Sequence, residues 1–113
     1  MAFNGSEIVD SDNGSMAVQL MISLIADHAD QSMERLTESK EPGLLGCIAC
    51  LRVLADAFHS EANCAIRDSR AEAWEKAWRE WTETRGAKIP KKYREHFLEN
   101  AATEFRLLRG HLS

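Results

Sequence analysis

The sequence has few of the residues that build sheets, disulfide scaffolds or membrane spans. Val and Ile together number nine among 113 residues, too few to fill the core of a β-sheet. The cysteines, Cys47, Cys50 and Cys64, are an odd number, and the first ten residues lack the basic and apolar regions of a signal peptide. We therefore expect reduced thiols in a cytoplasmic protein. The longest apolar stretches are a few residues long, far short of the roughly 20 residues that span a bilayer, so no membrane segment is expected.

Glycine and proline are also scarce, and they stand at the ends of long stretches without breakers. The eight residues occupy positions 5, 14, 42, 43, 46, 86, 90 and 110, which leaves 15–41, 47–85 and 91–109 free of them. The strong helix formers Ala, Leu, Glu, Arg and Lys make up 52 of the 113 residues. This composition, with a formal net charge of −4, predicts an all-α globular protein.

Apolar residues that recur at three- and four-residue spacing predict four amphipathic helices. The predicted helices cover 16–39, 43–66, 70–85 and 91–109. Because the connection at 40–43 is short, the first two helices should be antiparallel neighbours, and we predict a small up-down bundle of about four helices. We divide the chain into a mobile acidic arm over 1–14 and a single helical-bundle domain over 15–113.

Local signals indicate where these helices begin. Ser15 is expected to cap the first helix. Ser69 and Glu72 have the spacing of a capping box, which would open the third helix. Pro90 opens the fourth helix and Gly110 ends it.

The apolar stripes predict which residues form the core. On the fourth helix the predicted inner face carries Tyr93, Phe97, Ala101, Phe105 and Leu108. The stripes of the first and second helices consist of Val18, Met21, Ile22, Ile25, Ala29, Met33 and Leu36, flanked by Leu20 and Leu24, and of Leu44, Cys47, Ile48, Leu51, Leu54, Ala55, Phe58, Ala62 and Ala65.

Three tryptophans share one face of the third predicted helix. Trp74, Trp78 and Trp81 are its only large apolar residues, so its stripe is narrow. Tryptophan buries a large area and is enriched at binding hot spots. The three rings are therefore either core residues of this bundle, anchors in a homodimer or partner interface, or the lining of a small-molecule pocket.

A basic segment covers residues 85–94. It contains Arg85, Lys88, Lys91, Lys92 and Arg94 and no acidic residue, in a chain that is acidic overall. Such a patch can steer an acidic partner surface or bind nucleic acid, or it can simply be solvated. The acids of the following helix would repel a phosphate backbone, which makes nucleic acid the weaker of the two partners.

Cys47 and Cys50 form a CxxC motif near the start of the second predicted helix. Such a motif serves redox exchange, normally after a strand, or supplies two metal ligands. No strand is predicted here, and Cys64, the next cysteine, lies 14 residues beyond Cys50. Because Cys47 falls on the apolar stripe, we interpret it as a small buried residue.

Antiparallel pairing of the first two helices would bring a set of acids and histidines to one level. The set is Asp27, Asp56, His28 and His59. Two carboxylates and two imidazoles could bind a divalent metal. However, Asp27 points away from the apolar stripe, and no Glu-x-x-His repeat of the di-iron type occurs. We therefore expect no metal site and no cofactor.

Together these patterns predict a non-enzymatic helical interaction protein, such as a small adaptor, regulator or inhibitor. Its partner would be another protein or a second copy of itself. The predicted anchors are Trp74, Trp78 and Trp81, and the predicted steering charges are Arg85, Lys88, Lys91 and Lys92. The alternative is a nucleic-acid-binding protein that uses residues 85–94.

Overall fold

The computed structural model describes residues 5–36 and 43–113, and its regular structure is entirely helical. The α-helices of this part are α1 (Asp12–Glu34), α2 (Gly43–Ala57), α3 (His59–Ala65), α4 (Asp68–Arg85) and α5 (Lys91–Arg109). Two 3-10 helices, η1 (Ile8–Asp10) and η2 (Gly86–Lys88), precede α1 and α5. The all-α prediction is confirmed, because the described residues contain no strand.

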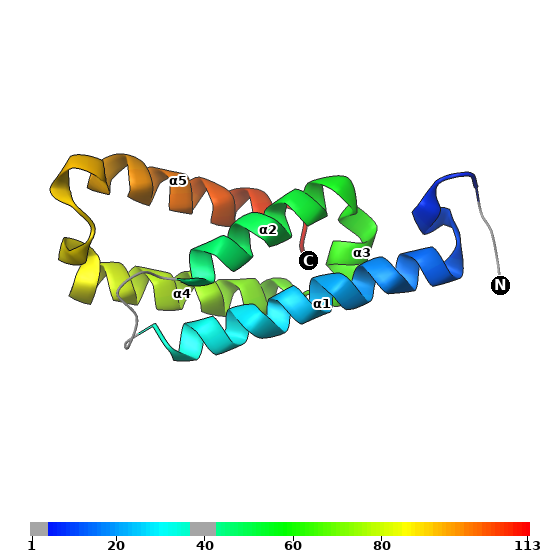
Figure 1. Ribbon diagram of the computed structural model, residues 1–113, viewed down its shortest axis with the longest axis horizontal. Helices are drawn as coiled ribbons and strands as arrows, with labels where there is room; N and C mark the ends of the chain where they lie inside the picture. Colours follow the sequence, from blue (N-terminus) through cyan, green and yellow to red (C-terminus); the bar gives the residue numbers. More distant parts are fainter. Residues whose placement is uncertain (1–4, 37–42) are drawn as a thin grey trace.

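The long helices lie side by side and alternate in direction. Figure 1 shows α1 and α2 running antiparallel, α4 returning behind them and α5 running back along α2. The antiparallel pairing of the first two helices is therefore confirmed. The molecule is elongated, with extents of 52 × 24 × 20 Å.

The first helix begins and ends earlier than expected. Its N-cap is Ser11, not Ser15, because the Ser11 side chain accepts a hydrogen bond from the backbone N–H of Gly14 at 3.1 Å. η1 and the first turn of α1 therefore lie within residues 1–14, and the division of the chain into an arm and a single domain stays a prediction. Mobility of the arm stays a prediction, and residues 1–4 lie outside the described residues. Residues 40–42 of the expected connection at 40–43 also lie outside the described residues.

The predicted second helix is two helices. Phe58 leaves the helical region, with φ −134° and ψ 64°, and divides α2 from α3. The expected capping box at Ser69 and Glu72 is wrong, because α4 already begins at Asp68 and its N-cap is Arg67. By contrast, α5 has the expected bounds.

The core lies between the helices and includes the three tryptophans. Leu44, Ile48 and Leu51 of α2 supply its middle. The full set of buried apolar residues is Ile22, Ala26, Ala29, Leu36, Leu44, Cys47, Ile48, Leu51, Ala55, Ala62, Ile66, Ala71, Trp74, Trp78, Trp81, Ile89, Ala101, Phe105 and Leu108. In the described residues, no helix combines the length and the apolar content needed to span a membrane.

Candidate interaction site

The tryptophan face of α4 is turned into the molecule. Trp74 is completely buried, and Trp78 and Trp81 are nearly so. The rings of Trp78 and Trp81 stack with their centroids 5.3 Å apart, and Trp78 also meets Phe97 of α5 at 6.2 Å. Of the three roles that the sequence left open for the tryptophans, the structure therefore shows that of core residues. A side chain enclosed by its own chain offers little surface to a partner.

The large aromatic residues at the surface are instead on α5. Tyr93 and Phe97 were expected on its inner face, but 57% of Tyr93 and 39% of Phe97 are exposed, so this expectation is wrong for both. The residues further along the same face, Ala101, Phe105 and Leu108, are buried as predicted. Figure 1 shows why: the N-terminal end of α5 extends past the start of α2, which leaves this end less covered.

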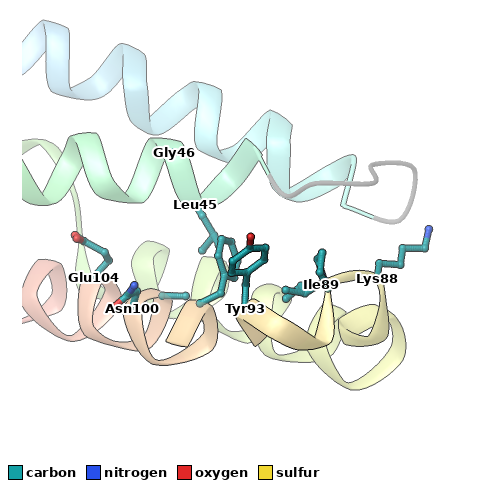
Figure 2. Close-up of a pocket in the computed structure, with 10 residues that line it drawn as sticks. Leu45, Gly46, Lys88, Ile89, Tyr93, Asn100 and Glu104 are labelled. Atoms are coloured by element: carbon teal, nitrogen blue, oxygen red, sulfur yellow. The ribbon is translucent and has the colours of Figure 1, made fainter. Parts of the chain in front are cut away.

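An apolar groove runs between α2 and α5 at this end of the molecule. It encloses about 640 Å³. Figure 2 shows Leu45 directed from α2 toward Tyr93, with Lys88 at one end and Glu104 at the other. The lining residues of this α2–α5 groove are Leu45, Gly46, Lys88, Ile89, Pro90, Tyr93, Phe97, Asn100, Ala101 and Glu104. The groove thus has an aromatic floor and charged residues only near its ends.

Of the basic residues expected to steer a partner, Lys88 lines one end of the groove, and the other three lie within four residues of it in the chain. Lys88, Lys91 and Lys92 are exposed, and Arg85 is half-buried. In the described part of the chain, none of these four cations has a carboxylate within ion-pair distance. We call Arg85, Lys88, Lys91 and Lys92 the basic cluster.

Arg94, the fifth basic residue of the segment, has a structural role. Its guanidinium donates to the backbone carbonyl of Ile89 at 3.0 Å and to that of Ala87 at 3.3 Å. These bonds attach the η2 turn to α5 and so fix the end of the groove. Arg94 is therefore less available to a partner than the basic cluster.

The opposite end of the groove is electrostatically neutralised. Arg52 of α2 holds both carboxylate oxygens of Glu104, with distances of 2.7 and 3.0 Å. This two-bond geometry is the strong form of an arginine–carboxylate pair. Uncompensated positive charge is consequently confined to the end near Lys88.

Cys47 lies in the core, as the sequence predicts, whereas Cys50 and Cys64 are exposed. Burial raises the pKa of the Cys47 thiol, which disfavours the reactive thiolate. A hydrogen bond to Ser32 opposes this effect but does not outweigh it. The two cysteines of the CxxC motif therefore have different surroundings.

The acids of the first hairpin pair with basic side chains rather than with a metal-ligand set. Asp27 binds Arg70 of α4 at 2.8 Å, while Asp56 binds His111 at 2.8 Å and Arg52 at 3.0 Å. His111 and Arg52 hold the pKa of Asp56 below its ordinary value. Among the described residues, no group of three or more His, Cys, Asp or Glu side chains is arranged to hold a metal ion.

Comparison with known proteins assigns no role to the groove. No protein family, curated protein or solved structure matches this chain. The α2–α5 groove was missed in the sequence because its two walls come from helices about 45 residues apart. The only signal for it was the proximity of the basic segment to Tyr93 and Phe97.

Proposed function

We propose that this protein is a non-enzymatic helical interaction module that binds a partner helix in the α2–α5 groove. One observation carries the proposal: Tyr93 and Phe97 are exposed in an apolar groove next to cations that have no carboxylate partner in the described part of the chain. Aromatic residues are enriched at the centres of interfaces because they bury a large, rigid area. The groove offers both such residues already in place.

The dimensions of the groove favour a short amphipathic helix. Its wall on α5 extends from Tyr93 to Glu104, which is about 17 Å at the rise of an α-helix. A partner helix of about three turns can lay its apolar stripe along this length, as in other helix-in-groove complexes. Acidic residues at one end of the partner would face Lys88, Lys91 and Lys92.

The basic cluster keeps the role that the sequence suggested, but the anchors change. Arg85, Lys88, Lys91 and Lys92 would steer an acidic partner and set its orientation. Because the structure buries Trp74, Trp78 and Trp81, we assign the anchoring role to Tyr93 and Phe97 instead. The tryptophans support the groove from below through the contact of Trp78 with Phe97.

Nucleic acid is the weaker candidate for the same surface. The groove beside the cluster is apolar, whereas a phosphate backbone would need a polar, positively charged track. The same helix also exposes Glu95 and Glu99. These two acids would repel a phosphate backbone that follows α5.

The proposal is tested by selecting helical peptides from a displayed library with the purified chain as bait. The selected peptides should carry apolar residues at i, i+3 or i+4 and i+7 together with Asp or Glu. The Lys91→Glu/Lys92→Glu variant should bind them at least about tenfold more weakly in low salt, with the difference shrinking as salt rises. The charge-reversed control Lys76→Glu, in an exposed position on α4, should bind like the wild type.

Two results would contradict the proposal. In the first, the library yields no acidic amphipathic sequence above background. In the second, fluorescently labelled single- or double-stranded DNA binds the wild type more tightly than any selected peptide, and the Lys91→Glu/Lys92→Glu variant loses that binding. The second result would establish the nucleic-acid alternative.

A further inference from the structure

A second apolar surface lies beside the α2–α5 groove, along exposed sides of α1 and α2. Leu20, Met21 and Leu24 of α1 are exposed by 61%, 56% and 52%. Met21 and Leu24 line a hollow of about 410 Å³ whose α2 wall includes Gly46 and Cys50, and Leu20 lies one turn before Leu24 on α1. We call this surface the α1–α2 face. Leu20, Met21 and Leu24 lie within one and a half turns of α1, so together they form one ridge.

Neither the ridge nor the hollow of the α1–α2 face carries a carboxylate, a lysine or an arginine, although His28 lines the hollow. Residues 13–26 of α1 and 43–51 of α2 contain no Asp, Glu, Lys, Arg or His. A side of a helix that carries several large apolar residues is normally covered. In α1 the described part of the chain covers only the side that carries Ile22, Ala26 and Ala29.

The protein also has more surface than a compact monomer of its size. Its accessible surface is 7301 Å², against about 6,200 Å² for a typical monomer of 12.7 kDa. The elongated shape, 52 × 24 × 20 Å, contributes to this difference, and so does the exposed side of α1. The radius of gyration is 15.7 Å, whereas a compact domain of this length has about 13 Å.

We propose that the α1–α2 face binds a second copy of this chain. Its large residues stand on α1 and its small residues, Gly46 and Cys50, line the hollow beside them. A two-fold axis through the face would place the α1 ridge of each copy over the hollow of the other, and a two-fold interface requires such self-complementarity. Because neither the ridge nor the hollow carries a carboxylate, two copies of a chain with net charge −4 can meet at this face without placing acidic groups against each other.

This dimer leaves the α2–α5 groove open. Tyr93, Phe97 and the basic cluster are not part of the α1–α2 face, although Gly46 lies between the two surfaces and lines both hollows. A two-fold dimer would therefore present two grooves. The inference does not depend on the proposed function, and either can fail alone.

Sedimentation equilibrium of the full chain tests the proposal. The wild type should be a dimer at micromolar concentration. The variant Leu20→Glu/Leu24→Glu should raise the dimer dissociation constant by about a hundredfold or more, as the loss of central apolar contacts does. The matched control Leu107→Glu changes an exposed leucine of α5 outside the face and should stay dimeric. Circular dichroism should show equal helix content in all three proteins.

Alkylation of the two exposed cysteines gives a second, independent measurement. Cys50 lies in the hollow of the α1–α2 face, while Cys64 is exposed on α3 and serves as an internal reference. With a maleimide and mass spectrometry, Cys50 should react more slowly than Cys64 in concentrated protein. The reaction rate of Cys50 should approach that of Cys64 when the protein is diluted, and also in the Leu20→Glu/Leu24→Glu variant. Peptide-binding variants such as Tyr93→Ser should leave this protection unchanged.

The proposal is overturned if the wild type sediments as a monomer at high micromolar concentration. It is equally overturned if Leu20→Glu/Leu24→Glu dimerises as tightly as the wild type, or if the reactivity of Cys50 does not change with protein concentration.

Discussion

The indole N–H of Trp74 donates to Oδ1 of Asp30 at 2.8 Å, and this bond ties α4 to α1. Arg70 closes on the same carboxylate, with Nη2 2.6 Å from Oδ2, and its guanidinium lies 5.7 Å from the centre of the Trp74 ring. Asp30 thus satisfies the polar atom of a completely buried ring. Burial raises the pKa of Asp30, but the hydrogen bonds from Arg70 and Trp74 outweigh this and hold it below its ordinary value.

Asp30→Ala should lower the free energy of unfolding by about 1–3 kcal/mol, because it leaves the buried indole N–H without an acceptor. In a Trp74→Phe background, which removes the donor, the same substitution should cost clearly less. Chemical denaturation of the four proteins of this double-mutant cycle measures the coupling. Equal effects in both backgrounds would mean that the bond between Trp74 and Asp30 contributes nothing to stability.

Two glycines should respond to alanine in opposite directions. At Gly46, within α2, an added Cβ would meet nothing within 4 Å, so Gly46→Ala should stabilise the monomer by about 0.5–1 kcal/mol through helix propensity. At Gly14 the added Cβ would clash with the carbonyl oxygen of Ile8 and lie 2.7 Å from Ser11 Oγ. Gly14→Ala should therefore bring no gain or destabilise. Thermal unfolding at concentrations below dimer formation compares them, and a gain at both positions would contradict the close packing of η1 on α1.

The ion pair between Asp68 and Arg109 should make the free energy of unfolding fall at low pH. Arg109 binds both carboxylate oxygens of Asp68 at 2.9 Å and holds the pKa of Asp68 below its ordinary value. A lowered folded-state pKa gives stability that is present above the unfolded pKa of about 3.9 and is lost as the pH falls through the folded value. Asp68→Asn should cost a few tenths to about 1 kcal/mol near neutral pH. In urea titrations the difference between wild type and variant should shrink below about pH 4; a difference independent of pH would contradict the pairing.

The sequence predicted the helices better than it predicted their ends and their exposed faces. Pro90 and Gly110 are strong local signals, and α5 has the predicted bounds. The break at Phe58 has no such signal, since neither glycine nor proline stands nearby, and only the backbone angles of Phe58 show it. Ser11 and Ser15 are both residues that commonly cap helices. Which of them caps α1 depends on how η1 packs on α1.

The candidate site shows a different limit of sequence reasoning. Helical periodicity places Tyr93 and Phe97 on the same face of α5 as Phe105, and the structure has them on that face. Whether a face is covered depends on how far the neighbouring helix extends, and periodicity does not contain that information. Phe105 is completely buried, whereas 57% of Tyr93 is exposed near the N-terminal end of α5, the end that extends past the start of α2. The burial of the three tryptophans likewise followed from the packing of α4 rather than from its stripe.

The central claim, that the α2–α5 groove is the binding surface, is tested most directly by one matched pair of variants. Tyr93→Ser removes an exposed aromatic residue of the groove, and Leu107→Ser removes an exposed apolar residue of the same helix outside it. In calorimetric titrations with a selected acidic amphipathic peptide, Tyr93→Ser should lose about 2 kcal/mol of binding free energy, roughly thirtyfold in Kd, while Leu107→Ser binds like the wild type. Equal affinities for all three proteins, or a larger loss for Leu107→Ser, would contradict the account.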